Sequence, residues 1–119
     1  MIAVTLALAL AFAPAPAAGD IGPEPTAEAF AALAEAELLR KLKKPQQLSF
    51  EWPYRLVAGP AGYYTCGRAR NAGKPRSPQV WVTALVARGQ LVSARWANPG
   101  AMLEYDCKQQ VKKGVLVAR

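Results

Sequence analysis

The sequence of 119 residues contains no histidine and only two cysteines. Without an imidazole to accept the proton, a Ser-His or Cys-His nucleophile pair is excluded. Two cysteines by themselves do not fill the four-ligand shell that a structural zinc ion needs. We therefore predict neither a metal site nor a bound cofactor.

Acidic side chains are scarce in the C-terminal two thirds of the chain. After Leu38 there are fifteen basic residues but only three acidic ones, Glu51, Glu104 and Asp106. Glu104 and Asp106 stand two positions apart in a predicted helix, so they point to different faces. General acid–base catalysis needs such groups held close together. We therefore predict no catalytic residues and no enzyme activity.

The same imbalance makes the chain strongly basic. The formal net charge is +7, and the fifteen basic and three acidic residues after Leu38 leave that part at +12. A domain of this charge favours anionic partners, and for an exported protein these include acidic proteins and anionic envelope polymers. The alternative is a solvated basic surface without a partner.

Charged side chains are missing altogether from residues 1–18, which run apolar from Ile2 to Ala13 and continue with small residues and prolines. This order is typical of a secretory signal peptide, and Ala15 and Ala17 supply the small residues that precede a cleavage site. An uncleaved anchor would need about 20 apolar residues to span the bilayer. We therefore expect a periplasmic or secreted protein with no membrane span after cleavage. The expected segments are a signal peptide (1–17), a linker (18–25) and one small domain (26–119).

The two cysteines, Cys66 and Cys107, both lie in the expected mature chain. In an oxidising compartment an even number of cysteines predicts a disulfide bond. Closing the loop between Cys66 and Cys107 stabilises a domain of this kind by about 4 kcal/mol in the chain-entropy model. No Cys-x-x-Cys spacing indicates a redox pair, so we predict a structural Cys66–Cys107 bond.

Two helices are indicated by apolar stripes at helical spacing. The first begins after Thr26 as N-cap and ends at about Lys43, ahead of Pro45. The second begins with Asn98 as N-cap and ends at Gly114. The stripe of the first helix is Phe30, Leu33, Ala34, Leu38 and Leu42, and that of the second is Leu103, Cys107 and Val111.

Between the helices the sequence is typical of strands and tight turns. Residues 79–87 are apolar on both faces and predict a central strand. A turn at Arg88-Gly89 leads into residues 90–96, whose Val92, Ala94 and Trp96 are expected to share a face. Residues 63–68 predict the strand that carries Cys66. The fold class is therefore α+β, with an N-terminal helix, a three- or four-stranded antiparallel meander, a C-terminal helix and one disulfide.

Two single positions carry further expectations. Gly67 within a strand indicates a bulge or a close approach of another backbone. Trp52 stands directly before Pro53, and we expect it to be the most exposed of the three tryptophans.

The candidate binding residues cluster on one strand and the loop after it. They are Tyr63, Tyr64, Arg68, Arg70, Lys74 and Arg76. Aromatic rings beside clustered bases bind nucleic acid by stacking and phosphate contacts, but export argues against that partner. The same groups suit an acidic protein or an anionic polymer, as in an inhibitor-like module. The alternative is that the tyrosines pack in the fold and the loop is solvated.

Residues 42–50, with Leu42, Pro45 and Phe50, and residues 64–71, with Cys66-Gly67, resemble a family of small exported proteobacterial proteins. The likeness covers residues 42–86. Residues 70–76 stand where that family has an Asn-rich segment and a Gly-Gly-Tyr, and they differ from both motifs. The resemblance implies a small exported domain and no particular activity. We therefore expect a non-enzymatic protein with a structural or binding role. An inhibitor-like module is the first alternative, and a nucleic-acid-binding protein is the second if the chain is not exported.

Overall fold

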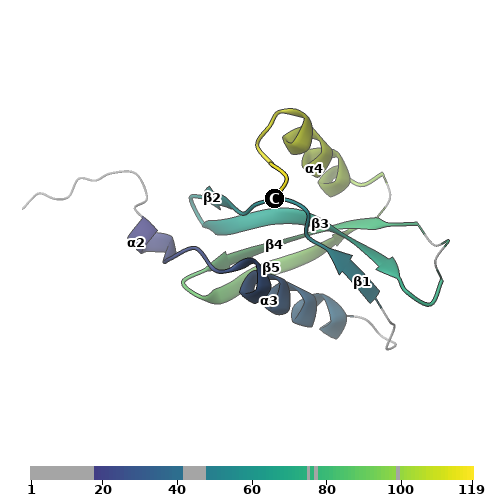
Figure 1. The fold of residues 1–119 in the computed structure, drawn as a ribbon, viewed down its shortest axis with the longest axis horizontal. Coiled ribbons are helices and arrows are strands. Elements are labelled where there is room, and N and C mark those ends of the chain that lie inside the picture. The colour runs from purple at the N-terminus through teal and green to yellow at the C-terminus, as the bar shows by residue number, and fades with distance from the viewer. Residues whose placement is uncertain (1–17, 42–47, 75, 77, 99) are drawn as a thin grey trace, which may run out of the picture.

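The computed structural model describes residues 18–41, 48–74, 76, 78–98 and 100–119. Within them, helices and strands alternate as an α+β fold whose two longer helices lie on opposite sides of one sheet (Figure 1). The helices are α2 (Ala18–Ile21), α3 (Ala27–Arg40) and α4 (Met102–Lys112). The strands are β1 (Leu48–Glu51), β2 (Val57–Gly59), β3 (Gly62–Asn71), β4 (Val80–Ala87) and β5 (Gln90–Ala97).

The sheet is antiparallel throughout, and β3, β4 and β5 form the predicted meander. β1 and β2 pair one after the other along the remaining edge of β3, from Leu48↔Asn71 to Gly59↔Gly62. The sheet has five strands instead of the three or four that were predicted, and the short β2 is the additional one. β4 lies between β3 and β5, so the prediction of a central strand is confirmed.

Helix α3 follows its sequence pattern closely. The Oγ1 of Thr26 accepts a hydrogen bond from the Ala29 N–H at 3.1 Å, which satisfies one of the free donors of the first turn. Phe30, Ala34 and Leu38 recur every four residues and are buried against the sheet. Leu42, the last member of the predicted stripe, lies outside the described residues, as does the whole of the expected signal peptide.

A bulge corrects the predicted faces of β5. Arg88 and Gly89 both have positive φ (52° and 73°), as a two-residue hairpin turn requires. The register then shifts between Leu85 and Val86, so that Leu91 pairs with Val86 and packs on the core. Val92 is the extra residue and is 55% exposed, so the expectation that it shares a face with Ala94 and Trp96 is wrong.

The expectation for Trp52 is also wrong, because this side chain is only 8% exposed. Its ring packs edge-on against Phe30 with 5.5 Å between centroids, and its Nε1 donates to Glu35 at 2.8 Å. The cause is Gly67, where an added Cβ would lie 2.5 Å from the Glu51 carbonyl oxygen and 2.6 Å from Trp52 Cε3. The glycine leaves room for Trp52 above β3, and the predicted close approach is confirmed.

The disulfide between Cys66 and Cys107 is present, and both cysteines are buried. It joins α4 to β3, and Leu103 and Val111 pack beside it as the stripe predicted. The helix begins at Met102 instead of just after Asn98, and its N-cap Ala101 has no side-chain hydrogen bond. Gly100 has a φ of 82°, which a helix does not allow, and the Ala101 N–H donates to the Asn98 carbonyl oxygen at 2.9 Å ahead of the helix.

Both ends of the described chain are attached to the domain. Ile21, within the expected linker, is buried, and its carbonyl oxygen accepts from the Arg88 N–H at 2.7 Å. At the other end Leu116 is buried, and the N–H of Arg55 donates to Val117 O at 2.8 Å. The C-terminal tail therefore pairs briefly with the segment before β2 and does not fray.

Candidate functional site

The two tyrosines among the predicted site residues are hydrogen-bonded within the fold. Tyr63 is buried, and its hydroxyl donates to the Gly22 carbonyl oxygen at 2.7 Å. Tyr64 is partly buried, and its hydroxyl donates to Gln110 Oε1 on α4 at 3.1 Å. The Tyr63 hydrogen bond holds the N-terminal segment on the sheet, and the Tyr64 hydrogen bond holds α4 on it.

Arg68 is also engaged by its neighbours. Its guanidinium carbon lies 5.4 Å from the centre of the Trp81 ring, a cation–π distance. Its Nε is 3.6 Å from Glu51 Oε1, which is an ion pair too long to be a hydrogen bond. Strand alternation places Cys66 and Arg68 on the α4 side of β3, whereas Ala69 lies on the α3 side. Arg68 therefore lies on the opposite face of the sheet from Ala69 and α3.

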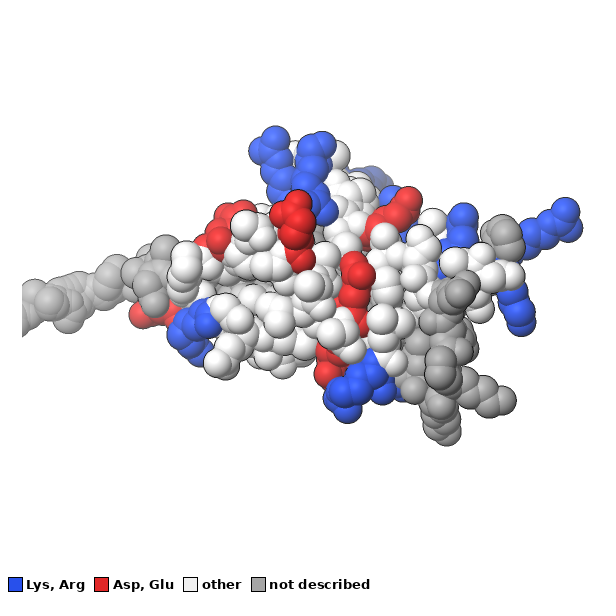
Figure 2. All heavy atoms as spheres, turned by 60° about the horizontal axis from the view of Figure 1, so that its bottom comes forward, with Lys and Arg blue, Asp and Glu red and all other residues white. Residues whose placement is uncertain are grey.

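The remaining basic residues gather where β3 ends. Asn71 Oδ1 accepts from the Gly73 N–H at 2.9 Å, and the Lys74 N–H donates to Asn71 O at 3.1 Å, so the chain turns there. Arg76 follows and is exposed. Figure 2 shows that the charged side chains at this end of the molecule are Lys and Arg, whereas the acidic ones lie toward its middle and its opposite end. This end of the sheet is therefore the electropositive end.

A recess of about 580 Å³ opens at the same end, on the α3 side of the sheet. Its apolar wall is formed by Leu48, Ala69, Val80 and Trp96 from four different strands. Its basic lining residues are Lys41, Lys74 and Arg70, although strand alternation places the Arg70 side chain with that of Arg68 on the α4 side. Its polar lining residues include Asn71 and Asn98. No acidic residue belongs to the described part of the lining. The volume falls in the range of about 300–1,000 Å³ that is typical of small-ligand sites.

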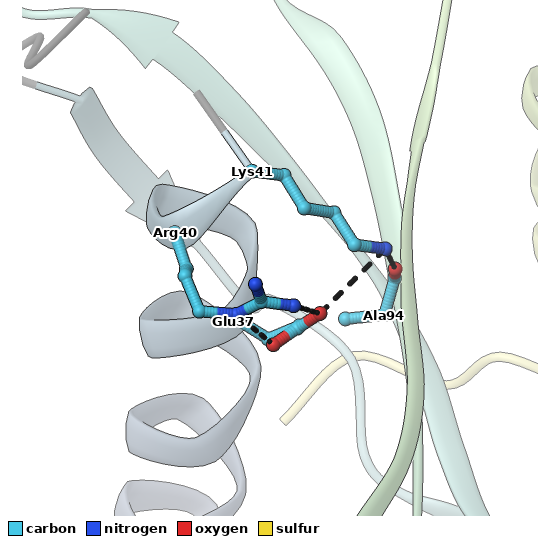
Figure 3. A network of polar contacts seen from close by, with 4 residues as sticks. All are labelled: Glu37, Arg40, Lys41 and Ala94. Atoms are coloured by element: carbon cyan, nitrogen blue, oxygen red, sulfur yellow. Dashed lines mark hydrogen bonds and ion pairs between the residues drawn. The ribbon is translucent and has the colours of Figure 1, made fainter. Parts of the chain in front are cut away.

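Lys41 is fixed in place at the edge of this recess. It reaches from the end of α3 to β5, where its Nζ donates to the Ala94 carbonyl oxygen at 2.6 Å (Figure 3). The nearest carboxylate, Glu37, is 4.0 Å from Nζ, but Arg40 binds both Glu37 oxygens at 2.9 and 2.7 Å. The hydrogen bonds from Arg40 lower the pKa of Glu37 and raise that of Arg40. An ammonium group has three donors, so Lys41 keeps hydrogen-bonding capacity beyond Ala94.

Sequence reasoning identified Arg70 and Lys74 but missed the other half of the recess. Val80 and Trp96 were interpreted as strand residues, and neither Leu48 nor Lys41 was assigned to a site. One signal was available: the apolar alternation of β4 and β5 continues to their ends, whereas α3 ends near Lys41. Without the strand order, that excess of apolar surface could not be assigned to one place.

A second recess is less suited to a ligand. It measures about 250 Å³, lies between α4 and the sheet, and includes both cysteines, Arg95 and Asp106. In the parts of the chain that are described, no group of three or more potential metal-ligating side chains occurs. The helices that the structure describes are all too short or too polar to cross a membrane.

Comparisons with protein-family models, curated proteins and solved structures give no significant match for this chain. The resemblance over residues 42–86 therefore stays a prediction, and the candidate site depends on its geometry alone.

Proposed function

We propose that this chain is a small exported, non-enzymatic binding protein that holds an anionic ligand at the basic end of its sheet. The observation that carries the proposal is the recess beside Lys41 and Lys74, whose described lining contains cations and no carboxylate. Cations around a concave, partly apolar surface concentrate anions there, because the low-dielectric walls reduce solvent screening.

Export is supported by the buried Cys66–Cys107 bond, because disulfides persist in oxidising compartments. The apolar N-terminal run supports the same compartment. In the periplasm or outside the cell, the available anions include acidic proteins and envelope polymers.

The test compares two pairs of cations with equal charge. Lys74→Gln/Arg76→Gln removes two charges beside the recess, and Lys112→Gln/Lys113→Gln removes two at the exposed end of α4. Binding to immobilised polyglutamate, followed at several salt concentrations, should weaken several-fold more for the first pair. Equal losses for both pairs would mean non-specific attraction and would refute the proposal.

An inhibitor-like module is the second candidate. It is favoured by Arg76, an exposed base in the connection between β3 and β4 that has no ion pair among the described residues. Such a module would lose its partner on Arg76→Glu and keep it when the apolar wall of the recess is altered. Nucleic-acid binding is less supported, because Tyr63 is buried and offers no stacking surface.

A further inference from the structure

We infer that the ligand of the recess is a small amphipathic carboxylate, whose apolar body lies against Leu48, Val80 and Trp96 and whose head group meets Lys41 and Lys74. The inference rests on the proposed function, which requires only an anion at this end, and adds the apolar half of the ligand.

The apolar half follows from the uncovered wall. Leu48, Val80 and Trp96 are each only partly buried, although all three continue the same face as the buried core residue Ala69. Water against such a wall is released when an apolar chain covers it. Each buried methylene then contributes about 0.8 kcal/mol, which is about fourfold in affinity.

The anionic half follows from the donors at the rim. Lys41 is pre-positioned by its bond to Ala94, so little side-chain entropy is lost when it binds a head group. The Oδ1 of Asn71 is occupied by the Gly73 N–H, and its amide nitrogen is a further donor. A cationic amphiphile would meet only like charge in the described lining, whereas a small inorganic anion would leave the apolar wall uncovered.

The first experiment compares probes on the full mature chain by isothermal titration calorimetry. We expect decanoate to bind, with affinity rising up to about fourfold per methylene from hexanoate to decanoate. Acetate and decyltrimethylammonium should bind at least tenfold more weakly than decanoate. Equal binding of the cationic amphiphile would overturn the inference, as would affinity that does not depend on chain length.

The second experiment uses two matched pairs of variants. Leu48→Ser makes the wall polar and should weaken decanoate binding roughly tenfold, whereas Val92→Ser removes an exposed valine outside the recess and should leave it unchanged. Lys74→Gln should weaken it up to about fivefold, and Lys112→Gln should not. Thermal unfolding of each variant verifies that it is folded.

The outcomes separate the two claims. If polyglutamate binding depends on Lys74 and Arg76 but decanoate does not bind, the proposed function stands and the inference is overturned. If neither polyglutamate binding nor decanoate binding depends on the recess residues, the proposed function and the inference are both overturned. Decanoate binding that Leu48→Ser and Val92→Ser weaken equally would also overturn the inference, because the ligand would then not lie in the recess.

Discussion

Helix α3 buries Phe30, Ala34 and Leu38 against one face of the sheet, whereas α4 buries only Cys107 against the other. The difference begins in the sequence, because α3 is rich in alanine and leucine and α4 is mostly polar. A helix with one buried side chain gains little from apolar burial, so a covalent bond holds it instead. The same sheet is thus covered by packing on one side and by a disulfide on the other.

The comparison also explains where the recess lies. The fourteen residues of α3 span roughly 21 Å, and the eight residues of β5, on which α3 packs, span roughly 27 Å, so the helix is shorter than the strand it covers. On the α3 side the surface beyond the helix is apolar, with Val80 and Trp96. On the α4 side, the recess beside the helix contains Thr83, Ser93 and Arg95. Leu85 and Leu103 also line that recess, but its volume is about 250 Å³ against about 580 Å³ on the α3 side. The α3 side therefore leaves the larger recess for a ligand.

The largest expected effect is on the α3 side. Phe30→Ala removes a buried ring that packs on Trp52 and should lower the free energy of unfolding by about 3–5 kcal/mol. Urea denaturation measures this loss. A loss below about 1 kcal/mol would contradict the claim that packing holds α3.

The disulfide variant tests the α4 side. Replacing Cys66 and Cys107 by alanine should cost about 4 kcal/mol, somewhat less if the unfolded chain stays compact. Hydrogen exchange should lose protection first in α4, while α3 and the sheet keep theirs. Uniform loss of protection across both helices would show that the two faces are not held independently.

The helix caps give a smaller contrast. Thr26→Ala removes the side-chain cap of α3 and should destabilise it by about 1 kcal/mol. Ala101→Ser adds a cap that α4 lacks, at a residue already in the extended conformation of an N-cap, and should stabilise it by up to about 1 kcal/mol. Thermal unfolding of the two variants should shift in opposite directions.

The smallest effect concerns acid. Hydrogen bonds from Arg40 lower the pKa of Glu37, and those from Lys108 and the Gly100 N–H lower that of Glu104. Both carboxylates therefore stabilise the fold above their unfolded pKa, and this contribution is lost as the pH falls through the lower folded value. The change is small because both groups are only partly buried, so solvent screens their charges. Glu37→Gln/Glu104→Gln should flatten the fall in urea midpoint between pH 7 and pH 3, and an unchanged slope would count against these bonds.

The sequence predicted the elements better than their contacts. The stripes of α3 and α4, the Arg88-Gly89 turn and the disulfide follow from local periodicity and cysteine number. The burial of Trp52 does not, because it depends on Gly67 allowing a distant segment to approach. The recess was missed for a similar reason: Lys41 and Leu48 are far from Trp96 in the chain, and only the sheet order brings them together.

The most direct test of the central claim uses the three tryptophan indole groups as reporters. Trp96 lines the recess, whereas Trp81 lies on the α4 side, stacked on Tyr54, outside the described lining. In a ¹H–¹⁵N spectrum titrated with decanoate, the indole signal of Trp96 should shift and saturate while that of Trp81 stays in place. A saturable shift of Trp81 without one of Trp96, or no saturable shift at all, would contradict the claim that the uncovered α3 face is the binding site.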